Sequence, residues 1–258
     1  MNRHALNVLE FARALDIVGG FASSALGARA VRERLPQTDR EALDGEQSRV
    51  FAMVAIVRSD VGWGMPPIPD CGQALARLRV EGTRLSGGEL LALGTLLRAS
   101  RMTYDALGDA RYPAVSLALL AGYRERLVSE KRLEDQVDRV ISEDGSVRDD
   151  ASASLRRLRR ELRGAEGELV SLLERIMAKL ESHHRVVDMS VTMRNGRYVI
   201  PVRREATRSV GGIVHDTSHT GATVFVEPPA AIDACNRIRE LEGEEAREVE
   251  PALARSPE

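Results

Sequence analysis

One segment, residues 150–182, constrains the fold more than any other part of the sequence. Its apolar residues recur at alternating steps of three and four positions, as Leu155, Leu158, Leu162, Ala165, Leu169, Leu172 and Ile176. This spacing puts them on one side of an α-helix and is the heptad pattern typical of packing against a partner helix. Such a helix would be about 45 Å long. Gly164 and Gly167 weaken it locally, by about 1 kcal/mol each relative to Ala.

Other parts of the chain also have apolar residues at helical spacing. They predict helices over residues 5–34, 40–58 and 114–127, the first of them divided in two at Gly19 and Gly20. Aromatic residues make up only 3% of the chain, so Leu, Ala and Val must fill the core. This composition is typical of proteins built from long helices.

Three local signals place helix ends and connections. Ser86 and Glu89 have the spacing of a capping box, in which each side chain accepts a hydrogen bond from the other's backbone. The prolines of residues 62–70 exclude a helix or a central strand and predict a loop. Gly145 interrupts two helical runs.

The period of the pattern changes after the long helix. Residues 191–202 alternate around Asn195-Gly196, the strongest sequence signal for a two-residue hairpin turn. A second pair of strands is expected over residues 213–215 and 223–226, and helical spacing returns from residue 229. The predicted fold class is therefore mainly α, with long helices and a small antiparallel β insertion.

Five arginines lie in and after the predicted hairpin. Arg194 opposes Arg197 across the turn, and counting by two places Arg203 on the same face, with Arg204 and Arg208 just beyond. Like charges opposed in this way are destabilising unless an anion binds. Guanidinium groups bind phosphates well. We therefore predict a row of phosphate contacts on one face of the hairpin, with an apolar face opposite.

Other interpretations of the basic residues stay open. The hairpin arginines are alternatively a solvated face screened by salt, or one neutralised by Glu205. A second basic group surrounds the leucines of the long helix: Arg156, Arg157, Arg159, Arg160 and Arg163. For this group we favour a solvated surface with ion pairs between neighbouring turns, and guidance of nucleic acid is the alternative. Few aromatic residues and no recognition helix are present, so no reading of bases is expected.

Residues 211–228 place His215, Asp216 and His219 within a short span. A zinc site of the H-E-x-x-H type needs both histidines on one face of a helix, whereas these two flank a loop rich in turn formers. We therefore interpret the stretch as a polar loop between two strands, with no metal ligands and no catalytic residues. His215 is expected to add a phosphate contact at low pH. A hydrolase or metal site here is the less favoured alternative.

Several function classes find no support in the sequence. It contains no G-x-x-x-x-G-K-[ST] loop, no nucleophile elbow and no cysteine with plausible catalytic partners. No catalytic site and no cofactor are therefore assigned to the chain. Its two cysteines, Cys71 and Cys235, match no zinc spacing and fit a reducing cytoplasm. No apolar run approaches the roughly 18 residues of a membrane span, so we expect a cytoplasmic protein without membrane contact.

Five segments carry a resemblance to one known family. They are LEFARALDIVGGFASSALGARAVRERLP, LRVEGTRLSGGELLALGTLL, ISEDGSVRDDASASLRRLRREL, MRNGRYVIPVRRE and GGIVHDTSHTGATVFVEPPAAIDACNRIRELEGEE. In this order they closely resemble the N-terminal half of the second bacterial branch of the MutS family, whose members suppress homologous recombination. The resemblance extends to about Glu250, and the last two segments are the most specific.

The resemblance implies a helical core and lever region with a small β clamp at its tip. The expected parts are a helical core (1–135), lever helices (136–185), the β clamp (186–228), a returning lever helix (229–250) and an irregular tail (251–258). Relatives form homodimers through other parts, bind ATP and Mg²⁺ in a separate ATPase domain and carry a nuclease domain. Here Pro251 and Pro257 are expected to break the last helix, and a truncated or frame-shifted chain would explain the missing domains.

We therefore predict the DNA-binding lever and clamp region of a MutS-like protein that suppresses homologous recombination. It would contact phosphates without sequence preference, through Arg194, Arg197, Arg203, Arg204, Arg208 and His215. One alternative is a helical scaffold for proteins or ribosomes, with structured RNA as the ligand, because some relatives are linked to stalled or collided ribosomes. The other is a non-functional truncated remnant.

Overall fold

The computed structural model describes residues 3–80 and 82–254 and divides the chain into two compact units. Unit 1 comprises Met1–Arg148 and Leu253–Glu258, and unit 2 comprises Asp149–Ala252. The described residues form eleven α-helices and one four-stranded antiparallel sheet, which confirms the mainly α class with a small β insertion. The finer division into core, levers and clamp stays a prediction.

The regular elements of unit 1 that the structure describes are helices, and Ile141 and Val147 form an isolated antiparallel bridge. The helices are α1 (Arg3–Val8), α2 (Phe11–Gly19), α3 (Ala25–Arg32), α4 (Arg40–Val57), α5 (Gly72–Leu78), α6 (Gly87–Ala106), α7 (Ala114–Arg124) and α8 (Lys131–Val140). α4 packs against α7 around a small apolar core that includes Ile56, Tyr112 and Leu120. The Tyr112 hydroxyl donates a hydrogen bond of 2.6 Å to the Gly62 carbonyl and so fixes the start of the expected proline-rich loop.

The first helical segment has one break more than expected. Glu10 adopts a left-handed backbone with a φ of 50° and separates α1 from α2. Residues 5–34 therefore belong to three helices where two were expected, although the division at Gly19 and Gly20 is confirmed. A single residue with positive φ does not change the spacing of apolar residues, so the sequence pattern continues through it.

α6 and α8 are joined by a buried ion pair. The Nε and Nη2 atoms of Arg101 donate to the two carboxylate oxygens of Glu134 at 2.7 and 2.9 Å, and only 3% of the Glu134 side chain is exposed. α6 begins with the predicted capping box of Ser86 and Glu89. After α8, Gly145 turns the chain with a φ of 80°, which confirms the expected interruption.

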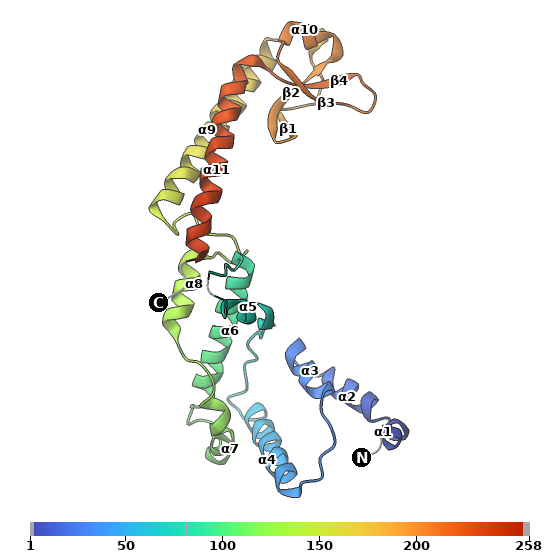
Figure 1. The fold of residues 1–258 in the computed structure, drawn as a ribbon, viewed down its shortest axis with the longest axis vertical. Coiled ribbons are helices and arrows are strands. Elements are labelled where there is room, and N and C mark those ends of the chain that lie inside the picture. The colour runs from blue at the N-terminus through green and yellow to red at the C-terminus, as the bar shows by residue number, and fades with distance from the viewer. Residues whose placement is uncertain (1–2, 81, 255–258) are drawn as a thin grey trace. The chain divides into compact units, whose positions relative to one another are not determined.

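Unit 2 consists of two long helices and the sheet. α9 (Ala153–Lys179) and α11 (Ile232–Ala254) lie side by side, with the sheet at one end of the pair (Figure 1). Arg159 Nε donates a hydrogen bond of 2.7 Å to Glu245, and Ser152 Oγ donates one of 3.0 Å to Glu248, so side chains link the two helices. The predicted long helix thus has its predicted partner helix.

Eight shorter elements connect these helices. The strands are β1 (Thr192–Arg194), β2 (Arg197–Arg203), β3 (Ile213–Thr217) and β4 (Thr223–Glu227). The short helical turns are η1 (Ser182–His184), η2 (Arg204–Ala206), α10 (Thr207–Val210) and η3 (Pro229–Ala231). Apolar residues of α9, β2, β4 and α11, such as Leu169, Ile200, Val226 and Ile238, form the core of unit 2.

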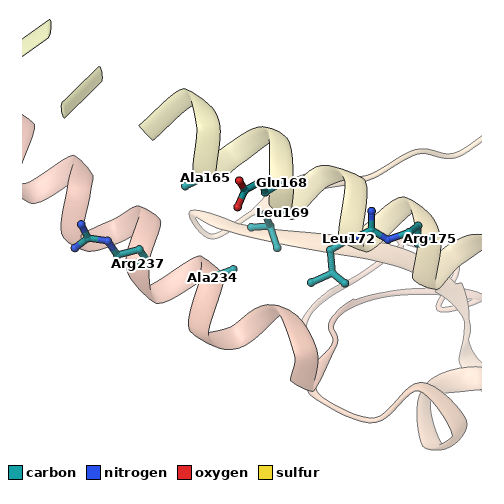
Figure 2. A pocket seen from close by; sticks show the side chains of 7 residues that line it. All are labelled: Ala165, Glu168, Leu169, Leu172, Arg175, Ala234 and Arg237. Atoms are coloured by element: carbon teal, nitrogen blue, oxygen red, sulfur yellow. The ribbon is translucent and has the colours of Figure 1, made fainter. Parts of the chain in front are cut away.

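The buried stripe of α9 follows the helical period rather than a strict heptad. Leu155, Leu169 and Leu173 are buried, whereas Leu172, the residue expected in the seam, is only half-buried. Leu155 and Leu173 are 18 positions apart, which is five turns at about 3.6 residues each. A heptad repeat drifts from this line by about 20° per heptad. Leu172 instead lines a crevice between α9 and α11 (Figure 2), so it faces the partner helix as expected but is not part of the buried core.

The sheet has the strand order β1-β2-β4-β3, and all neighbouring strands are antiparallel. Arg194 pairs with Arg197 across the predicted turn, where Asn195 and Gly196 have φ angles of 51° and 71°. Positive φ at both positions is what a type I′ hairpin turn requires. The second predicted strand pair is also confirmed, as β3 and β4.

β2 is buried on both faces, contrary to expectation. Val199 and Ile200 are neighbours and therefore point to opposite sides of the sheet, yet each is 0% exposed. β2 lies between β1 and β4, and its middle is covered on both sides. The predicted face of arginines along the whole hairpin is therefore interrupted by buried residues.

The last helix continues beyond the expected end. α11 extends to Ala254 with Pro251 inside it, so the irregular tail predicted from residue 251 is wrong as far as residue 254. The fixed φ of proline is compatible with a helix, although its ring removes one backbone hydrogen bond and crowds the carbonyl four residues earlier, at a cost of about 3 kcal/mol. Residues 255–258, with Pro257, lie outside the described residues.

No helix in the described ranges is both long and apolar enough to cross a membrane.

The register of α9 can be tested with two leucine substitutions. Leu173→Ala should lower the free energy of unfolding by about 2–5 kcal/mol, because it removes a fully buried side chain. Leu172→Ala removes the same atoms from the half-buried crevice and should cost clearly less. Urea unfolding followed by circular dichroism measures both, and a larger loss for Leu172→Ala would contradict the observed register.

Two glycines of unit 2 should respond to alanine in opposite ways. A Cβ atom at Gly212 would lie 2.0 Å from the Glu227 carbonyl oxygen, at a φ of 95° that alanine rarely adopts. We expect Gly212→Ala to destabilise unit 2 by about 1–3 kcal/mol.

A Cβ atom at Gly167 would meet no other atom within 4 Å, so Gly167→Ala should stabilise α9 by about 0.5–1 kcal/mol. Thermal unfolding of both variants checks the sign of each effect.

Candidate nucleic-acid interface

The six residues predicted to contact phosphate lie in two groups within unit 2. The inner group, Arg194, Arg197 and His215, lies on β1, β2 and β3. The outer group, Arg203, Arg204 and Arg208, lies at the end of β2, in η2 and in α10. The two groups differ in the partners of their side chains.

Glu227 is the centre of the inner group. This residue ends β4, and only 1% of its side chain is exposed. Its Oε2 lies 2.6 Å from Nε2 of His215, and its Oε1 accepts a hydrogen bond of 3.3 Å from Nη1 of Arg197. The same Arg197 nitrogen donates to Oδ1 of Asn236 on α11 at 2.8 Å. A buried carboxylate needs such partners, because an unpaired one is very costly to remove from water.

The environment of Glu227 also includes a thiol. Burial raises the pKa of Cys235 above its usual value, and a hydrogen bond to Glu227 raises it further, so this thiol is neutral and protonated. Cys235 lies on α11. The Glu227 carboxylate therefore holds together side chains from β2, β3 and α11, in addition to its own strand.

A β-bulge brings His215 to this carboxylate. Val214 pairs with Val226 and Asp216 pairs with Phe225, so His215 is the additional residue of β3. Bulges re-aim a side chain in this way. The backbone carbonyl of His215 accepts a hydrogen bond of 2.9 Å from the Asn195 side chain, which fixes β3 against the first hairpin turn.

Arg194 also has an acidic partner. Its Nε lies 3.2 Å from a carboxylate oxygen of Asp216, and its guanidinium carbon lies 4.4 Å from the centre of the Phe225 ring. Both contacts fix the side chain against the sheet. Arg194 and Arg197 are therefore paired with Asp216 and Glu227, and not with Glu205 as the alternative interpretation suggested, because β3 and β4 carry acidic residues to them.

The outer arginines have a different environment. Arg203, Arg204 and Arg208 are exposed. Arg203 Nε donates a hydrogen bond of 3.3 Å to the Arg185 carbonyl, and Arg204 Nε donates one of 2.8 Å to the Gly221 carbonyl. In the described part of the chain no ion pair joins these three side chains to a carboxylate, Glu205 included. Carbonyl partners position a guanidinium group without neutralising its charge.

The loop after β3 forms a turn and is not a convergent site. Ser218 Oγ accepts a hydrogen bond of 3.1 Å from the Thr223 backbone, and the Gly221 backbone donates one of 2.8 Å to the Ser218 carbonyl. His219 is exposed, whereas His215 contacts Glu227. Within the described ranges these histidines do not belong to a group with metal-binding spacing. The hydrogen bonds within the turn agree with a polar loop between β3 and β4.

The basic group on α9 is largely paired. Arg159 contacts Glu245 and Asp149, both at 2.7 Å, and Arg163 contacts Asp149 at 3.1 Å. Arg157 lies 3.8 Å from Glu161, one turn away. These ion pairs agree with the favoured interpretation, in which the basic group is a charged helix surface.

Sequence reasoning missed the role of Glu227. Glu227 directly follows the apolar run Val224–Val226, and this position at the end of a buried strand is the one local sign in the sequence that it could need a cationic partner. The identity of that partner depends on the pairing of β4 with β2 and β3, which no sequence spacing indicates.

Removal of the Glu227 charge should destabilise unit 2. Glu227→Gln leaves Arg197 and His215 without their carboxylate, and we expect a loss of about 2–4 kcal/mol, because breaking one partner of a largely buried pair is costly. Asp216→Asn removes an exposed partner of Arg194 and should cost less than about 1 kcal/mol. Chemical unfolding of the two variants measures the difference, and equal effects would contradict the central role of Glu227.

The comparisons with known proteins agree with the resemblance. No protein-family model matches the chain. Endonuclease MutS2 of Gemmatimonas aurantiaca is 57% identical over 253 residues, which cover 98% of this chain and 31% of that protein. Endonuclease MutS2 of Geobacillus sp. (strain WCH70) is 33% identical, and that of Acetivibrio thermocellus is 32% identical, each over 98% of this chain and 32% of the relative. The chain is therefore a homologue of the endonuclease MutS2 proteins that corresponds to about a third of their length.

Proposed function

We propose that unit 2 is a clamp that holds DNA by its phosphates, without reading its sequence. The observation that carries this proposal is the outer group of arginines. Arg203, Arg204 and Arg208 are exposed, follow one another over six positions and have no carboxylate partner in the described part of the chain.

The anchoring of two of these side chains supports a phosphate ligand. Arg203 and Arg204 use Nε for a backbone carbonyl, which leaves their terminal nitrogens available to donate to an anion. A guanidinium group whose rotamer is already fixed loses less entropy when it binds. Phosphate oxygens accept from arginine in the same paired geometry as carboxylates. The outer group therefore fits a polyanion that crosses the end of β2.

The inner group has a supporting role in this proposal. Arg194, Arg197 and His215 already have carboxylate partners, so they fix the hairpin and do not contact phosphate directly. This assignment narrows the predicted contact residues from six to three. It also explains how two arginines can face each other at the hairpin turn without an external anion.

The relatives support the choice of ligand. An endonuclease acts on nucleic acid. The chain is homologous to a region that makes up about a third of the length of proteins with that name. We propose that the clamp serves the suppression of homologous recombination that the resemblance implies, and that DNA cleavage and ATP-driven motion belong to other parts of the whole protein. Contacts to phosphates alone give affinity without sequence preference.

Salt-dependent binding tests the clamp directly. The triple variant Arg203→Ala, Arg204→Ala and Arg208→Ala should bind fluorescent duplex DNA more weakly than the unchanged chain. The slope of log K against log salt is negative, and its magnitude should decrease by about one for each phosphate that is no longer bound. Fluorescence anisotropy over a series of salt concentrations measures this slope, and two duplexes of unrelated sequence should give the same value.

A matched control separates the outer arginines from the general effect of charge. Arg13, Arg40 and Arg58 are exposed residues of unit 1, and their replacement by Ala changes the net charge equally. This control should retain the slope of the unchanged chain. An unchanged slope in the outer-group variant, or an equal loss in the control, would refute the proposed contact surface.

A further inference from the structure

We propose that Glu181, His183 and His184 form a binding site for a divalent transition metal of the zinc class. The three residues lie at and within η1, between the end of α9 and the sheet. Their candidate ligand atoms, one from each side chain, all lie within 4.8 Å of one another. The proposal does not depend on the proposed contact with DNA.

The spacing of these atoms is close to that of a zinc site. Nδ1 of His183 lies 3.4 Å from Oε2 of Glu181. Two ligands of a tetrahedral zinc ion are about 3.3 Å apart, since each lies about 2.0–2.1 Å from the metal. The ring of His184, which is half-buried, is 4.0 Å from the exposed ring of His183, centre to centre. We expect side-chain rotation to bring the three ligand atoms to one ion.

Neighbouring histidines seldom converge in regular secondary structure. Side chains at adjacent positions point away from each other on a helix and to opposite faces on a strand. The short 3₁₀ turn of η1 overcomes this limit and places both rings on the same side, next to a carboxylate. Two imidazoles and one carboxylate are the protein ligands of many zinc sites, and imidazole also suits copper and nickel.

Hydrogen bonds hold the backbone of the turn before any metal binds. The His184 backbone donates a hydrogen bond of 2.9 Å to the Glu181 carbonyl. The Arg185 side chain donates to the Leu180 carbonyl at 2.7 Å and to the Ala178 carbonyl at 2.5 Å, and Arg185 pairs with Val202 of β2 as an isolated bridge. The turn is thus fixed at both ends, and a preorganised site costs less entropy on binding.

Three protein ligands leave a coordination position for water or another molecule, as in open zinc sites. The first two ligands are well exposed, with 72% of the Glu181 side chain and 66% of the His183 side chain accessible. We therefore expect reversible binding and not a structural metal on which folding depends. A bound ion would cross-link three side chains of a single turn, which lies between α9 and the sheet.

Calorimetric titration of the full chain with zinc chloride, after removal of metals by a chelator, tests the site. The unchanged chain should bind one zinc ion, and the double variant His183→Ala and His184→Ala should lose at least tenfold in affinity. Glu181→Gln should weaken binding by a smaller factor. His219→Ala replaces an exposed histidine of the β3–β4 loop and should bind zinc as the unchanged chain does.

Cobalt gives a second measurement that does not depend on heat. Co²⁺ in a tetrahedral or five-coordinate site with imidazole ligands has visible absorption bands that change with its ligands, so the bands should appear with the unchanged chain and be lost in the double variant. Thermal unfolding without metal should be similar for both proteins, since His183 is exposed and His184 is only half-buried. The absence of zinc binding to the unchanged chain, or undiminished binding to the double variant, would overturn the proposal.

Discussion

The buried carboxylate of Glu227 organises the sheet of unit 2. It receives a guanidinium group from β2, an imidazole from β3 and a thiol from α11, and it belongs to β4 itself. A charged group with 1% exposure is stable only with partners of this kind. The bulge at His215 and the side-by-side packing of β2 and β4 both serve to bring these partners together. The sheet is thus tied to α11 by polar contacts as well as by its apolar core.

This arrangement changes the meaning of the arginines in the sequence. Two of the five in and after the hairpin are neutralised from within by Glu227 and Asp216, and three are left at the end of β2 and in the turns that follow. A count of arginines along the sequence therefore overstates the number of positive charges that the surface offers to a polyanion. The narrower group of Arg203, Arg204 and Arg208 offers three side chains for contacts with phosphate.

Local signals in the sequence predicted much of the fold. The capping box at Ser86, the turn at Asn195-Gly196 and the long helix of residues 153–179 each depend on neighbouring residues, and the structure confirms each of them. Features that depend on distant partners were not predictable in this way. Leu173 replaces Leu172 in the core because the helix keeps its natural period, and Glu227 finds Arg197 because β4 lies next to β2.

The pairing of α9 with α11 has a consequence for the order in which unit 2 can fold. The contact between Arg159 and Glu245 joins residues 86 positions apart. At a synthesis rate of about 5–20 residues per second, Glu245 leaves the ribosome roughly 4–17 s after Arg159. During this interval the part of α9 around Arg159 lacks its partner helix, and closing so long a loop is slow compared with forming either helix. Translation speed between residues 180 and 245 is therefore a factor in whether the chain reaches its native pairing.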